Sequence, residues 1–69
     1  MLGHPKYNYN DNVRFHTWEG DPDIHEGSIF VIDRYGTFEY GEDVSYDILC
    51  KQERVLYKHI KESLVIGLK

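Results

Sequence analysis

Two histidines and two aspartates are the residues whose types suggest a metal site. His16, Asp21, Asp23 and His25 fall within one stretch of ten residues. Imidazole and carboxylate groups together can hold zinc or a similar ion. Their spacing matches no structural zinc pattern, however, and the chain has no Cys-x-x-Cys motif. We therefore expect these side chains to be solvated, and we expect neither a bound metal ion nor a cofactor.

The single cysteine raises the question of nucleophilic catalysis. Cys50 and His59 could in principle serve as nucleophile and base. Cys50 alternates with Tyr46 and Ile48, which places it on the expected core face, where a thiol behaves as a small hydrophobic group. The chain also lacks a glycine-rich phosphate loop and a serine elbow. We expect no catalytic residue, so the sequence predicts that the protein is not an enzyme.

A modest basic and aromatic patch occupies the second half of the chain. It consists of Lys51, Arg54, Tyr57, Lys58 and Lys61. Such a patch can stack a base and hold phosphate groups. The alternative is that Lys58 and Lys61 pair with the nearby Glu53 and Glu62, or are simply hydrated. Nucleic-acid binding through these five residues is the alternative to the main functional hypothesis.

That main hypothesis comes from the acidic first half. The net charge is −4 at pH 7, yet residues 1–47 carry ten acidic and three basic groups, whereas residues 48–69 carry two acidic and five basic ones. The loop at residues 19–27 is the most acidic segment and follows Trp18. Loops on a rigid scaffold often carry binding sites, and an exposed tryptophan can anchor a partner.

We therefore predict a non-catalytic module that binds an unidentified protein partner, as a monomer or weak homodimer. The expected contact residues are Trp18, Asp21, Asp23, Tyr35 and Tyr40. The carboxylates would set the charge of the partner, and the aromatic rings would supply contact area. A third hypothesis is an aromatic cage for a cation, formed by Trp18 with nearby tyrosines.

Size and composition limit the architecture that can carry these sites. The chain has 69 residues, which is one small domain, and its single cysteine excludes an internal disulfide. A fold without disulfides suits a reducing cytoplasm, and no apolar run is long enough to span a membrane. We expect residues 1–11 to form a loosely ordered arm and residues 12–69 to form the domain.

The pattern that organises the domain is the stretch at residues 27–40. Ile29 to Ile32 is an unbroken run of β-branched and aromatic residues, which predicts a strand. Asp33 to Gly36 has the composition of a tight turn, and residues 37–40 would form the returning strand. Four consecutive apolar residues would be buried together only if the strand bends between two small sheets. The stretch therefore predicts a strongly curved β-barrel.

The remaining segments alternate as half-buried strands do. Val13 and Phe15 share one face of a strand that begins at Asn12. A second such face, in residues 44–51, carries Val44, Tyr46, Ile48 and Cys50. Further strands are expected at residues 55–58 and 64–68, separated by a 3-10 turn near residues 59–63. Five to six antiparallel strands with this ending predict an all-β, SH3-like barrel.

The same residues resemble a group of small uncharacterised SH3-like proteins of Gram-positive bacteria and their phages. The similarity covers residues 12–66, namely Asn12–Phe15, Gly27–Ile29, Ile32–Asp33, Gly36–Thr37, Tyr46–Ile48 and Leu56–Glu62. The resemblance implies a small barrel and carries no settled activity. The chain departs from readers of proline-rich peptides, since it lacks their Ala-Leu-Tyr-Asp-Tyr start and paired tryptophans. A shared barrel is in any case an analogy and not a shared role.

Overall fold

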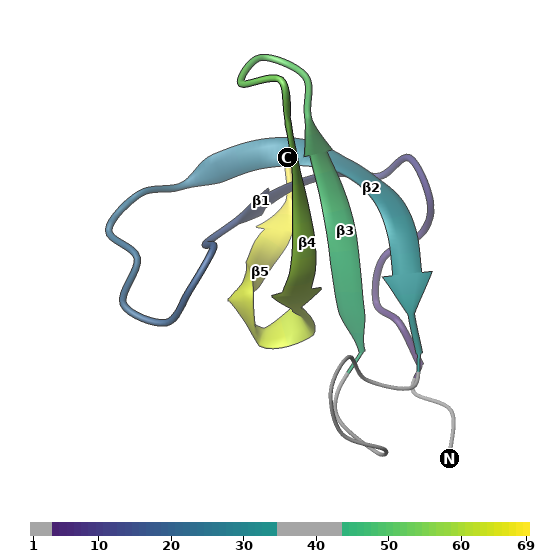
Figure 1. The fold of residues 1–69 in the computed structure, drawn as a ribbon. Coiled ribbons are helices and arrows are strands. Elements are labelled where there is room, and N and C mark those ends of the chain that lie inside the picture. Colours follow the sequence, from purple (N-terminus) through teal and green to yellow (C-terminus); the bar gives the residue numbers. More distant parts are fainter. Residues whose placement is uncertain (1–3, 35–43) are drawn as a thin grey trace.

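The computed structural model describes residues 4–34 and 44–69, which form one antiparallel β-sheet (Figure 1). Its elements are, in chain order, β1 (Asn12–Phe15), β2 (His25–Asp33), β3 (Ser45–Cys50), β4 (Val55–Lys61), the 3-10 turn η1 (Glu62–Leu64) and β5 (Val65–Leu68). The prediction of an all-β chain is confirmed. The 3-10 turn is also present, but it starts three residues later than expected because residues 59–61 continue β4.

The strands lie in the order β4-β3-β2-β1-β5, and every neighbouring pair is antiparallel. β2 curves, so that its first half pairs with β1 and its second half pairs with β3 (Figure 1). β4 and β5 are the two edges, and they do not pair with each other within the residues that the structure describes. The sheet is therefore open in these ranges.

The core lies on the face that the alternation predicts. Its buried apolar residues are Val13, Phe15, Ile29, Val44, Tyr46, Ile48, Cys50, Ile60 and Val65. They come from all five strands and the residue before β3, so each strand contributes to one shared interior. The prediction that Val44, Tyr46, Ile48 and Cys50 form one buried face is confirmed.

The expectation that the run from Ile29 to Ile32 is buried on both sides is wrong. Ile29 is in the core and Ile32 is half-buried, but Phe30 is 57% exposed and Val31 is also exposed. Phe30 follows the buried Ile29 and so points to the outer face of the sheet. Val31 also points outward because of a β-bulge, since the pairing of β2 with β3 shifts register between Ile29 and Val31. An extra residue in one strand turns side chains away from the faces that simple alternation assigns. The expected returning strand at residues 37–40 lies outside the described residues.

The close approach of β2 to β3 depends on the absence of a side chain at Gly27. A Cβ atom at this position would lie 2.7 Å from the Leu49 carbonyl oxygen and 2.8 Å from Cγ2 of Ile48. It would also lie 3.0 Å from Sγ of Cys50. Real Cβ atoms do not approach a backbone oxygen so closely, so only glycine allows the two strands to approach to this separation.

The described part of the N-terminal arm contacts the sheet. The ring of Tyr7 packs edge-on against Tyr46, with 5.9 Å between the ring centroids. The hydroxyl of Tyr46 donates to Oε2 of Glu62 at 2.6 Å, and the backbone N–H of Lys6 donates to the same oxygen at 3.1 Å. Burial, and then the Glu62 carboxylate, raise the pKa of Tyr46 well above its usual range.

In the described ranges, no helix is long and apolar enough to cross a membrane.

Candidate functional site

The loop between β1 and β2, residues 16–24, is held together by one buried carboxylate. Oδ2 of Asp21 accepts the backbone N–H and the hydroxyl of Thr17, both at 2.9 Å. Oδ1 accepts the backbone N–H of Asp23 at 2.9 Å, and the Asp21 N–H donates to the Trp18 carbonyl oxygen at 3.1 Å. The backbone donors of Thr17 and Asp23 lower the pKa of Asp21 to about 2. The negative charge of Asp21 therefore accepts hydrogen bonds from within the loop and stabilises its conformation.

His25, at the start of β2, connects this loop to the turn between β3 and β4. Its Nε2 lies 3.6 Å from Oδ2 of Asp21, and its Nδ1 lies 3.1 Å from Oε2 of Glu53. The imidazole packs against the rings of Phe15 and Tyr57, with centroid separations of 5.6 Å and 5.2 Å. The loop is thus fixed at its far end to the core and to a second turn.

Glu53 completes this cluster from the turn at residues 51–54. The hydroxyl of Tyr57 donates to Oε1 of Glu53 at 2.7 Å. This hydrogen bond, and then the one from His25, lower the pKa of Glu53. The same carboxylate raises the pKa of Tyr57 to about 12. Both oxygens of Glu53 are therefore engaged on the inner side of the sheet.

The four side chains that the sequence offered as candidate metal ligands, His16, Asp21, Asp23 and His25, form no coordination site among the described residues. Nδ1 of His16 is 2.8 Å from the Asp23 carbonyl oxygen, and His25 faces Glu53. Asp21 is satisfied by N–H and hydroxyl donors, as described above. In residues 4–34 and 44–69, no three His, Cys, Asp or Glu side chains are grouped so that they could hold a metal ion.

The thiol of Cys50 is on the buried face, as the alternation predicts. Burial, and then the nearby Glu53, raise the pKa of Cys50 to about 11. A thiol in this state is a poor nucleophile at neutral pH, because the thiolate is the reactive form. His59 is exposed on β4, and its backbone N–H donates to Oδ1 of Asp47 at 3.0 Å.

The loop between β1 and β2 also presents large apolar side chains to solvent. Trp18 is 57% exposed and Ile24 is 60% exposed. Gly20 has a φ of 92°, a left-handed conformation that glycine adopts readily, and a Cβ there would lie 3.0 Å from Cζ3 of the Trp18 ring. The tryptophan therefore rests on a glycine within a turn that Asp21 holds in place. This arrangement can offer a preformed apolar contact to a partner.

The five predicted partner-binding residues differ in where they lie. Trp18 and Asp23 are exposed on the loop, whereas Asp21 is buried and holds the loop from inside. Tyr35 and Tyr40 lie outside the described residues. Ile24 was missed because an isolated isoleucine in a loop gives no signal of its exposure, and its position two residues after Pro22 was the only indication.

The five residues of the basic and aromatic patch do not share one surface. Tyr57 pairs with the buried Ile48 in register and packs edge-on against Phe15, so its ring faces the core. Lys51, Arg54, Lys58 and Lys61 are all exposed. Because successive residues of a strand point to opposite faces, Lys58 points away from the core. The patch therefore offers charge without a stacking ring.

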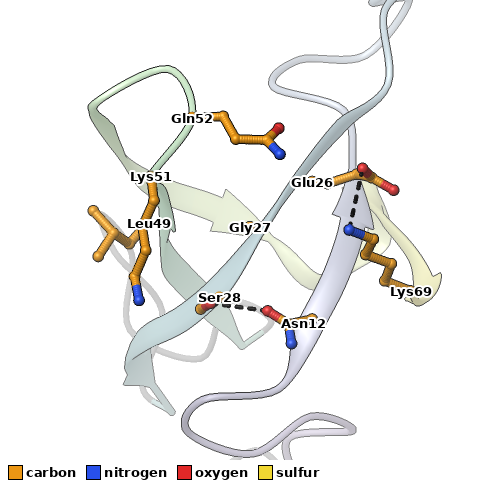
Figure 2. A pocket seen from close by; sticks show the side chains of 8 residues that line it. All are labelled: Asn12, Glu26, Gly27, Ser28, Leu49, Lys51, Gln52 and Lys69. Carbon is orange, nitrogen blue, oxygen red and sulfur yellow. Dashed lines mark hydrogen bonds and ion pairs between the residues drawn. The ribbon is translucent and has the colours of Figure 1, made fainter.

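A polar hollow of about 130 Å³ lies on the outer side of the sheet (Figure 2). Its lining consists of Asn12, Glu26, Gly27, Ser28, Leu49, Lys51, Gln52 and Lys69. The Ser28 hydroxyl donates to Oδ1 of Asn12 at 3.0 Å, which orients the amide of Asn12. Glu26 lies 3.6 Å from Nζ of Lys69 and 3.1 Å from Nε of Arg14.

The chain matches no family model, no curated protein and no solved structure.

Proposed function

We propose that the protein is a small non-catalytic interaction module that binds a protein partner through the loop between β1 and β2. The observation that carries this proposal is Trp18, a largely exposed ring on a loop whose backbone is fixed by the buried Asp21 carboxylate. A large aromatic side chain supplies much of the binding energy at protein interfaces, and a preformed loop loses little entropy on binding.

Charge indicates which partner this loop would suit. Glu19 and Asp23 are exposed on either side of the turn that carries Trp18, and Asp21 acts only as a positioning residue. A partner with an apolar pocket bordered by lysine or arginine would complement this loop. Tyr35 and Tyr40 belong to the proposed contact set on sequence grounds. Binding of a cation on the face of Trp18 is compatible with the same geometry.

We also infer that the fold is a small SH3-like barrel, in keeping with the resemblance to SH3-like proteins of Gram-positive bacteria and their phages. The strand order β4-β3-β2-β1-β5 and the 3-10 turn between β4 and β5 support this inference. The curvature of β2, which pairs with β1 and β3 in turn, also supports it. The buried free thiol of Cys50 suits a reducing compartment such as the cytoplasm.

Affinity capture tests the proposed contact. Immobilised wild-type protein should retain a specific protein from an extract of its own cells, and Trp18→Ala should not. Tyr9→Ala is the matched control, because Tyr9 is about as exposed as Trp18 and lies outside the loop. Gly20→Ala should also weaken capture, since the added Cβ displaces the Trp18 ring. Retention of the same protein by Trp18→Ala, or its loss with Tyr9→Ala, would contradict the proposal.

A further inference from the structure

Two lysines lie on the outer face of β4 and a third lies in the turn that follows β3, and we call them the outer lysines: Lys58, Lys61 and Lys51. In β4, Tyr57 and Ile60 face the core, so the lysine that follows each of them points outward. Lys51 follows the buried Cys50 and lines the outer hollow beside Leu49 (Figure 2). The three positive charges therefore share one side of the sheet.

The acidic residues near these lysines accept hydrogen bonds from other groups, and one of them, Asp47, lies on the same outer face, between the inward Tyr46 and Ile48. Both oxygens of Glu53 accept hydrogen bonds, one from the Tyr57 hydroxyl and one from the His25 imidazole. Glu62 binds the buried tyrosine hydroxyl and a backbone N–H of the arm, and Asp47 accepts a backbone N–H of β4. Among the residues that the structure describes, no outer lysine forms an ion pair. The pairing of Lys58 and Lys61 with Glu53 and Glu62, which the sequence allowed, does not occur.

A bulge sets the spacing of two of these charges. From Tyr57 to Ile60, three steps along β4 match only two steps along β3, and His59 has a left-handed φ of 61°. Two strand steps correspond to about 7 Å. The backbone positions of Lys58 and Lys61 are therefore separated by about two strand steps instead of three.

The hollow beside Lys51 adds hydrogen-bond donors to this charge. The side-chain amides of Gln52 and Asn12 line it together with Lys51. The Ser28 hydroxyl donates to Asn12, and Lys69 is paired with the Glu26 carboxylate, which also lines the hollow. Lysine and amide groups of this kind make contacts to phosphate oxygens. Of the large apolar side chains exposed in the described ranges, none lines the hollow. Binding to a lipid surface normally needs such side chains for insertion, so the hollow fits phosphodiesters better than a bilayer.

We propose that the outer lysines and the adjoining hollow bind the phosphate backbone of a nucleic-acid strand without reading its bases. The inward ring of Tyr57 supports the second part, because the one ring of the predicted basic patch is turned to the core and cannot stack a base on this face. This surface is separate from the loop that carries Trp18, so the module has one face for each kind of partner.

The test is fluorescence anisotropy of a labelled oligothymidylate, titrated with the full chain at several salt concentrations. Three lysine–phosphate contacts predict a slope of about −2 for log affinity against log salt, which is roughly a 20-fold loss between about 50 and 200 mM. Lys58→Glu should weaken binding and reduce the loss over the same interval to roughly 7-fold, because one contact is removed. Lys6→Glu, an equal change of charge at an exposed lysine of the arm, should preserve both affinity and slope.

Lys58→Gln removes the contact without adding a negative charge, and it should shift the slope in the same way as Lys58→Glu. Circular dichroism of each variant separates lost binding from lost folding. Three results would overturn the proposal: absence of binding at low salt, equal losses for Lys58→Glu and Lys6→Glu, or binding to vesicles of anionic lipid without binding to the oligonucleotide.

Discussion

Replacing Gly27 with alanine should destabilise the fold, because the added methyl group has no room. It would meet the Leu49 carbonyl oxygen at 2.7 Å, the Ile48 side chain at 2.8 Å and Cys50 Sγ at 3.0 Å. The oxygen belongs to β3 and the side chain to the core, so relief requires that β2 move away from β3. Overpacking of this kind costs about 1–3 kcal/mol. For a domain of this size, each kcal/mol lowers Tm by about 4–8 °C.

Gly67→Ala provides the matched control for this substitution. Gly67 also lies in a strand, but a Cβ there would meet no atom within 4 Å. Its alanine variant should be as stable as the wild type or slightly more stable, since alanine reduces the entropy of the unfolded chain. Thermal unfolding followed by circular dichroism measures both variants. If Gly27→Ala melts at the same temperature as Gly67→Ala, β2 and β3 do not approach as closely at this residue as described, and the reasoning fails.

Three further predictions concern the loop, the arm and the core. Asp21 has a folded-state pKa of about 2, against 3.8 for the free group, so its stabilisation is complete above about pH 4 and is lost as the pH falls toward 2; Tm measured against pH should show this loss in the wild type and less of it in Asp21→Asn. Tyr46→Phe removes a hydrogen bond to Glu62, and chemical denaturation should show a loss of about 1–2 kcal/mol. Phe15→Ala should cost about 3–5 kcal/mol, whereas Phe30→Ala should stay within about 0.5 kcal/mol, and equal losses in the two would contradict the assigned burial.

Alternation was a sufficient guide wherever a strand is regular. Val13 with Phe15, and Tyr46 with Ile48, were assigned to the core from a period of two, and the structure buries all four. The rule fails at Val31, which is exposed although it lies two residues after the buried Ile29, because a bulge depends on how β2 registers against β3 and not on the local composition of β2. Local pattern therefore predicts strands and faces but not the irregularities between them.

The loop and the charged face show a second limit of sequence reasoning. Asp21 and Asp23 are the same residue type two positions apart, yet one is buried as an internal acceptor and the other is exposed. Glu53 lies close to Lys51 in sequence but bonds to His25, which is 28 residues away. The partner that a side chain contacts depends on the tertiary structure, and composition alone does not predict it.

The left-handed residue in β4 has a consequence for how this molecule behaves in a crowded solution. A regular edge strand exposes evenly spaced backbone donors and acceptors. Another polypeptide can pair with them, and repeated pairing of this kind builds a fibre. His59 interrupts that ladder, and its own amide is turned back to the Asp47 carboxylate. The positive charges of Lys58 and Lys61 in this edge strand further disfavour pairing with an apolar polypeptide. The kink that spaces the charges thus also discourages this side of the molecule from seeding amyloid.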